Sequence, residues 1–133
     1  MAATMYELAG GAAGIRRLTD RFYRLVFADD LLAELFHQHG DHHADRLAMW
    51  LTELFGGPAE HSEHRGGFAV MEGAHHHLQI TEPQRARWAE LMFRAAEETG
   101  MPAEFRGRLV PYIEGGSTFA LRVSWPVDRR GPR

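Results

Sequence analysis

The stretch AAGIRRLTDRFYRLVFA, residues 12–28, decides the fold class of this 133-residue chain. Its apolar residues recur every three or four positions, which places on one face of a helix Ile15, Leu18, Phe22, Leu25 and Val26. Apolar residues keep this spacing along nearly the whole chain, and no run alternates with the period of two that a half-buried strand needs. We therefore predict an all-α domain.

Glycine pairs and prolines divide the chain into further helical segments. Between these breaks we expect helices over residues 4–9, 12–28, 29–36, 42–55, 68–77, 81–99 and 102–123. In the last of them one stripe is expected to contain Phe105, Leu109, Tyr112, Ile113, Gly116, Phe119 and Ala120. Gly115 and Gly116 should allow a neighbour to approach closely. We predict one domain over residues 1–125 and a flexible tail over 126–133.

Local signals set several of these helix ends. Asp29 can cap the third helix, and Gly56 is placed to end the helix over 42–55. Thr81 and Gln84 have the spacing of a capping box, in which each side chain bonds the backbone of the other, and Pro83 is tolerated in the first turn. We therefore expect these helix ends to form whatever the packing of the helices.

Composition limits the classes of function. With a net charge of -3 and a pI near 6.3, the chain has no basic field for phosphates, so nucleic acid is not an expected partner. There is no cysteine, which excludes disulfides, thiolate metal sites and cysteine nucleophiles. No stretch approaches the length of a membrane span, and no leader is recognised, so we expect a cytoplasmic protein. Phosphate-binding glycine loops, nucleophile elbows and HExxH motifs are missing.

The nine histidines are the unusual feature of this composition. Helical spacing puts His43 on the same stripe as Leu47, Trp50, Leu51 and Leu54, where it would be the one polar ring at the end of an apolar wall. Such a ring suits a ligand pocket above a flat cofactor, and it equally suits a boundary histidine in contact with solvent. The residues alone leave both interpretations open.

The triplet His75-His76-His77 forms a second cluster. Successive helical residues point about 100° apart, so at most one of the three faces inward from a regular helix. A neutral imidazole is a common ligand of haem iron. The alternative is a solvated step of histidines or a chance surface site for a divalent metal.

In order along the chain, MYELAGG (5–11), DRFYRLV (20–26), LFGGP (54–58), SEHRGG (62–67), His75 followed by Ile80-Thr81, and QRARW (84–88) resemble the group II truncated haemoglobins. The resemblance extends from Met5 to Phe119. It implies a shortened globin fold in which two antiparallel helix pairs form a two-over-two sandwich around haem b. The glycine pairs Gly10-Gly11 and Gly56-Gly57 match the hinges of that fold.

The resemblance also implies roles for single residues. His75 matches the proximal iron ligand, with His76 as the register alternative. Tyr23 and Trp88 match distal hydrogen-bond donors to a bound ligand, and His43 falls at the position that gates the pocket, where many members have a small residue. The haem contacts implied in addition are Phe36, Arg46, Leu47, Trp50 and Leu78. Phe36 lacks the hydroxyl that could add a donor, and Arg46 would suit a haem propionate.

The function implied is binding of dioxygen and other diatomic ligands at a His-ligated iron. Slow ligand release would favour redox chemistry on the ligand, such as nitric oxide dioxygenation or peroxide consumption, with a reductase as partner. His43 either bonds the ligand or coordinates the iron itself. We expect a monomer or homodimer. The alternative from another class is a haem-free helical adaptor or divalent-metal-binding protein on the same fold.

Overall fold

In a computed structural model, the described residues are 3–37, 43–59 and 78–125. All regular elements within them are helices: α1 (Met5–Leu8), α2 (Gly11–Phe27), α3 (Ala33–His37), α4 (His43–Leu54), α7 (Glu82–Glu98) and α8 (Ala103–Val123). The all-α prediction is confirmed. The helix expected over 68–77 and the tail expected over 126–133 lie outside the described residues.

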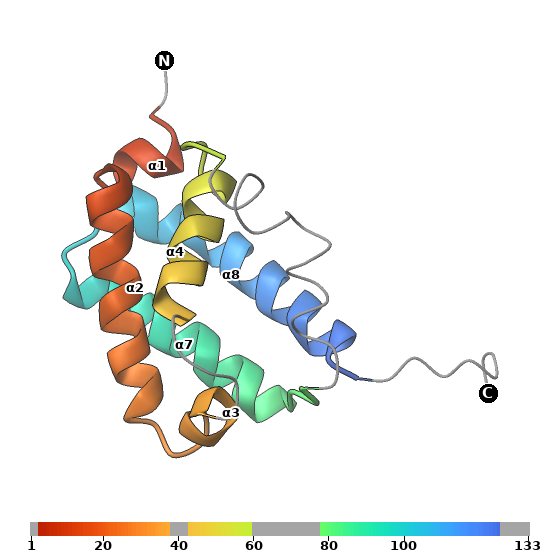
Figure 1. Ribbon diagram of the computed structural model, residues 1–133. Coiled ribbons are helices and arrows are strands. Elements are labelled where there is room, and N and C mark those ends of the chain that lie inside the picture. The colour runs from red at the N-terminus through yellow and green to blue at the C-terminus, as the bar shows by residue number, and fades with distance from the viewer. Residues whose placement is uncertain (1–2, 38–42, 60–77, 126–133) are drawn as a thin grey trace, which may run out of the picture.

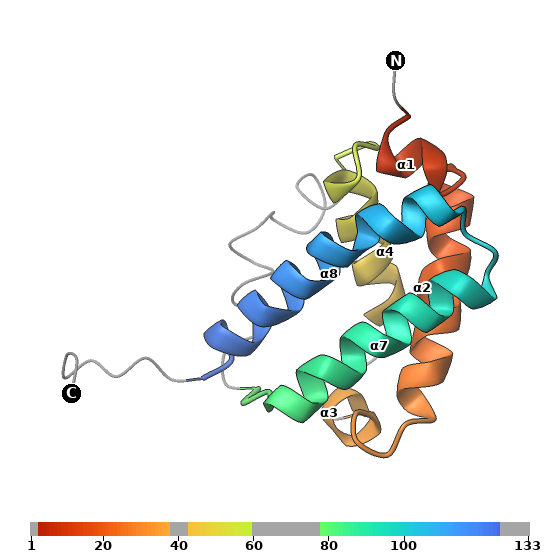
Figure 2. The ribbon, with the colours of Figure 1, turned by 180° about the vertical axis from the view of Figure 1, so that it is seen from behind.

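The four long helices form two layers. In Figure 1, α2 and α4 lie side by side in front of α7 and α8, and the reverse view of Figure 2 shows α7 and α8 in front. The most extensive packing joins α2 to α4, α7 to α8 and α2 to α7. This arrangement is the predicted two-over-two sandwich. No helix in the described ranges is both long and apolar enough to cross a membrane.

The predicted capping signals form as expected at two helix ends. The Thr81 N–H donates to Gln84 Oε1 at 2.9 Å, and the Gln84 N–H donates to Thr81 Oγ1 at 3.3 Å, which completes the capping box of α7. Gly56 follows α4 with a φ of +95°, a conformation that glycine adopts without a Cβ penalty. Both signals act within one turn of helix, so tertiary packing does not change them.

The third helix begins later than expected. Asp29 Oδ1 accepts a hydrogen bond from the Leu31 N–H at 3.0 Å, but this bond closes a turn rather than the first turn of a helix. The helix α3 itself begins at Ala33. Asp29 therefore caps a turn that leads into α3.

The core is built mainly by the inward face of α2. Ile15, Leu18, Phe22 and Val26 are fully buried, as predicted, whereas Leu25 lies half-buried at the edge of this face. On one face of the first and middle turns of α8, the expected residues are buried, namely Phe105, Leu109 and Ile113.

The predicted stripe on α8 is wrong in two places. Tyr112 is 38 % exposed, and the buried position after Ile113 is taken by Ser117 instead of Gly116. The buried residues of α8 follow one another at intervals of four, whereas the predicted stripe mixed intervals of three and four, so the two sets diverge after Ile113. No described residue lies within 4 Å of a Cβ built at Gly115 or Gly116, so the described part of the chain provides no close neighbour there.

Candidate functional site

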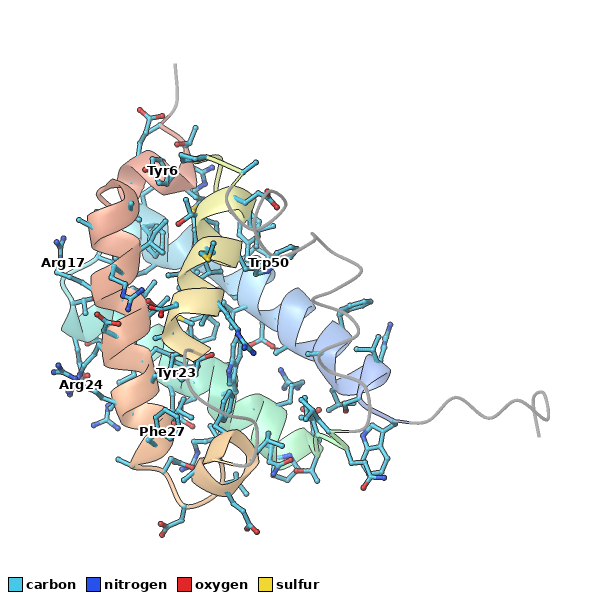
Figure 3. The ribbon with its side chains drawn as sticks, viewed as in Figure 1. Tyr6, Arg17, Tyr23, Arg24, Phe27 and Trp50 are labelled. Atoms are coloured by element: carbon cyan, nitrogen blue, oxygen red, sulfur yellow. The ribbon has the colours of Figure 1, made fainter. Side chains whose placement is uncertain are left out.

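Tyr23 lies at the centre of an aromatic cluster where α2 meets α3. Its side chain is 8 % exposed, and its ring centroid lies 5.0 Å from Phe22, 5.6 Å from Phe36 and 6.1 Å from Phe27. The rings of Phe22 and Phe36 meet it in edge-to-face geometry, which is a favourable arrangement for aromatic pairs. Figure 3 shows Tyr23 and Phe27 one turn apart on α2, beside α3. The Tyr23 ring is thus held among three other aromatic rings.

The same burial raises the pKa of the phenol. Desolvation raises the pKa of Tyr23 above its ordinary value of about 10, because a phenolate loses its hydration there. A tyrosine hydroxyl is protonated at neutral pH, and the raised pKa extends this state further into the alkaline range, so the hydroxyl can act as a hydrogen-bond donor.

Trp88 contributes a second donor from α7. Its ring meets Phe22 edge-on, with centroids 5.2 Å apart and an interplanar angle of 84°. The indole is half-buried at the edge of the core. Tyr23 and Trp88 come from different helices, and both of their rings contact the Phe22 ring.

The helix α4 contributes large apolar side chains that the core does not cover. Ala48, Leu51, Thr52 and Phe55 form its buried face, whereas Leu47 and Trp50 are only half-buried and Leu54 is 39 % exposed. In Figure 3, Trp50 lies on the side of α4 away from α2. The stripe predicted from periodicity therefore divides into a core face and a partly open apolar face.

Half-buried apolar side chains, on this face of α4 and on other segments, are of the kind that line a site for a flat apolar cofactor. These side chains come from three helices and from the segment before α7: Phe36 on α3, Leu47 and Trp50 on α4, Trp88 on α7, and Leu78. All but Leu78 pack against the core. Small-molecule sites are lined mainly by such apolar and aromatic side chains, with a few polar groups that orient the ligand. Tyr23 and Trp88 supply those polar groups, so the residues present are suited to haem.

The remaining predicted site residues are placed only in part. Arg46 is exposed on α4, and no ion pair joins it to another described residue. His43 is the first residue of α4, but its side chain lies outside the described part. His75 and His76 also lie outside the described residues, so their roles stay predictions.

An ion pair that sequence reasoning missed joins the two sides of the aromatic cluster. Arg87 Nη1 of α7 lies 2.6 Å from Asp29 Oδ2, and the Asp29 side chain is only 11 % exposed. The pair connects α7, which contains Trp88, to the turn before α3, which contains Phe36. The two residues are 58 positions apart, and no local pattern relates them.

Phe27 is a second residue of the site that the sequence does not single out. Its ring lies 6.4 Å from that of Phe36, and the side chain is 39 % exposed at the outer edge of the cluster. Its position four residues after Tyr23 is a signal that could have identified it, because such residues share a helix face. Within the described residues, no group of three or more His, Cys, Asp or Glu side chains is arranged to hold a metal ion.

Residues 4–117 match the family model described as bacterial-like globin. Similar solved structures include the hemoglobin of the thermophilic phototrophic bacterium Chloroflexus aurantiacus, at 31% identity over 90% of this chain and 98% of that chain, with a TM-score of 0.77. The group II truncated hemoglobin of Bacillus anthracis is 23% identical over 96% of this chain and 97% of that chain, with a TM-score of 0.83. The group II 2-on-2 hemoglobin of Agrobacterium tumefaciens is 27% identical, over 90% and 94%, with a TM-score of 0.77.

Proposed function

Because this chain belongs to the bacterial-like globin family and has the fold of the group II truncated haemoglobins, we propose that it binds dioxygen and other diatomic ligands at a haem iron ligated by His75. Haem iron, when bound, supplies the reversible coordination of such ligands. The supporting observation is that the buried Tyr23 phenol and the Trp88 indole both contact Phe22, beside the half-buried apolar side chains.

The two donors set the strength of ligand retention. With haem bound, the Tyr23 hydroxyl and the Trp88 N–H would donate to a diatomic ligand, and apolar side chains such as Phe36 and Leu47 would help to exclude water. Hydrogen bonds to a charged acceptor contribute about 1.5–3 kcal/mol each, so two donors slow ligand release by orders of magnitude. Slow release suits chemistry on the ligand, such as nitric oxide dioxygenation or peroxide consumption, with a reductase that supplies electrons.

The absorption spectrum of the purified protein tests haem binding and the identity of its ligand. After reconstitution with haem b, the wild type should show a Soret band, and His75→Ala should change the band strongly whereas His76→Ala should not. If the two substitutions exchange their effects, the ligand is His76. Haem-free protein after reconstitution, or a Soret band that neither substitution changes, would refute the proposal and favour a haem-free helical protein.

Dioxygen dissociation kinetics test the two donors. Tyr23→Phe and Trp88→Phe should each release dioxygen at least about tenfold faster, since each loses one charge-assisted hydrogen bond. Tyr112→Phe is the matched control, because it also removes a phenol hydroxyl but from a side chain that is 38 % exposed on α8. Equal rates in all three variants would contradict the assignment of donors.

His43 is tested by the ferrous protein without added ligand. If His43 coordinates the iron, the spectrum is six-coordinate and low-spin, and His43→Ala converts it to a five-coordinate spectrum. If His43 bonds the ligand instead, the unliganded spectrum is five-coordinate from the start, and His43→Ala speeds dioxygen release.

A further inference from the structure

The ion pair between Arg87 and Asp29 joins α7 to the turn that precedes α3. Arg87 Nη1 lies 2.6 Å from Asp29 Oδ2. At the same time Asp29 Oδ1 accepts a hydrogen bond from the Leu31 N–H at 3.0 Å. One carboxylate therefore closes the turn with one oxygen and holds α7 with the other. Figure 2 shows α3 beside the start of α7.

Hydrogen bonds lead from Asp29 to the aromatic cluster. The Asp29 carbonyl accepts from the Ala33 N–H at 2.8 Å. The Leu32 carbonyl accepts from the Phe36 N–H at 3.3 Å, and the Leu32 side chain is buried in the core. The Phe36 ring then meets the Tyr23 ring edge-on, with centroids 5.6 Å apart. Asp29 thus organises the segment that brings Phe36 to the phenol.

The other partner of the ion pair leads to the same phenol through α7. Arg87 is followed directly by Trp88, whose ring centroid lies 5.2 Å from that of Phe22. The Phe22 ring in turn lies 5.0 Å from the Tyr23 ring. These contacts form a closed circuit, which passes through Arg87, Trp88, Phe22, Tyr23, Phe36 and Asp29.

The ion pair is the polar contact of this circuit, and it tolerates less movement than the ring contacts do. Aromatic pairs are favourable over a range of centroid distances of about 4.5–7 Å, so neighbouring rings can slide against one another. A charge-assisted hydrogen bond is short and directional. The pair between Arg87 and Asp29 therefore fixes α7 against the turn more tightly than the rings alone would.

We propose that Arg87 and Asp29 are positioning residues for the two ligand donors, Tyr23 and Trp88, an inference that rests on the proposed function. The pair holds the helix that contains Trp88 against the segment whose Phe36 ring packs on Tyr23. It thereby sets how the indole and the phenol are placed relative to each other. Loss of the pair should leave both donors in the protein but spread their positions, which weakens their hydrogen bonds to a haem ligand.

Two single variants and their double variant test the pair in the haem-reconstituted full chain. Asp29→Asn removes the charge but keeps an Oδ1 acceptor for the Leu31 N–H, so it should fold even if Arg87→Met does not. Arg21→Met is the matched control. Arg21 Nε lies 2.7 Å from Glu98 Oε2 and joins α2 to the last residue of α7, and its side chain is 40 % exposed, against 44 % for Arg87.

The readouts are the C–O stretching band of the carbon monoxide adduct, the rate of dioxygen release, and hydrogen exchange of the Ala33 and Phe36 amides. The C–O band responds to hydrogen-bond donors around the bound ligand, so a loss of global stability alone does not move it. In Asp29→Asn and Arg87→Met we expect the band to shift or broaden, and release and exchange to become roughly fivefold faster. Arg21→Met should keep the wild-type band and both rates.

The double variant shows whether the two side chains act as one unit. Its effect should be no larger than that of Arg87→Met alone, because the pair is already lost in each single variant. Effects of the single variants that add up in the double variant would overturn the proposal, since they would not arise from one shared contact.

The outcomes separate this inference from the function on which it rests. If the wild type takes up no haem, the proposed function fails and the inference fails with it. If the wild type binds haem, but the variants of Asp29 and Arg87 keep the C–O band and dioxygen release of Arg21→Met, only the positioning role is overturned, even where the two amides exchange faster. A change in the C–O band confined to the variants of Asp29 and Arg87 supports it.

Discussion

Replacing Tyr23 by phenylalanine tests whether the site holds a protonated phenol. In the folded protein burial raises the pKa of Tyr23, whereas in the unfolded chain the phenol ionises near pH 10. Above pH 10 the unfolded state therefore loses this proton first, and rising pH favours unfolding. The stability that Tyr23 contributes through this shift is complete below pH 10 and is lost as the pH rises toward the folded-state pKa.

The size of this loss of stability follows from the single proton that the unfolded chain releases and the folded protein keeps. Each pH unit above 10 lowers the free energy of unfolding by about 1.4 kcal/mol, so from pH 9 to pH 11.5 the wild type should lose about 2 kcal/mol more than Tyr23→Phe. In this pH range few other side chains of the protein titrate. The chain has no lysine and no cysteine, so its three tyrosines are the only side chains whose ordinary pKa lies in this interval.

Denaturant unfolding at a series of pH values, with the haem and its ligand in one state throughout, measures this difference. Trp88→Phe is the control, since it also alters the site but removes no titrating group, and its difference from wild type should stay constant with pH. In parallel, the tyrosinate absorbance of folded wild type and folded Tyr23→Phe should coincide up to pH 11. If the folded proteins already differ there, or if both lose stability equally, the phenol is not held protonated by burial.

Three further substitutions probe the fold that holds the site, each by denaturant unfolding. Gly57→Ala should cost about 1–3 kcal/mol, because a Cβ there would lie 2.5 Å from the Tyr6 ring; an unchanged midpoint would contradict this close packing. Thr81→Ala should cost about 0.5–2 kcal/mol through loss of the capping box with Gln84, and Thr81→Ser should restore most of it. Gly107→Ala, in the interior of α8 with no described residue within 4 Å of the added Cβ, should gain about 0.5–1 kcal/mol, and a loss would refute the open surroundings.

The helix ends that sequence analysis predicted best are those set by short-range chemistry. The Thr81–Gln84 capping box and the Gly56 terminus each depend on residues within one turn, and both form as expected. The Asp29 side chain also bonds nearby backbone, but the neighbouring residues continue as a turn before α3 begins. Local signals therefore predicted that the chain breaks here, but they predicted less well the residue at which the next helix starts.

By itself the sequence determined the helical class, most helix limits and the inward face of α2, because apolar spacing and capping act along one segment. Tertiary structure decided which apolar residues stay in the core and which remain open to a cofactor, as on α4, where Leu51 is buried and Trp50 is not. It also brought Tyr23 and Trp88 to one phenylalanine and Arg87 to Asp29. These contacts join residues far apart in the chain, and periodicity along a single helix contains no information about its partner.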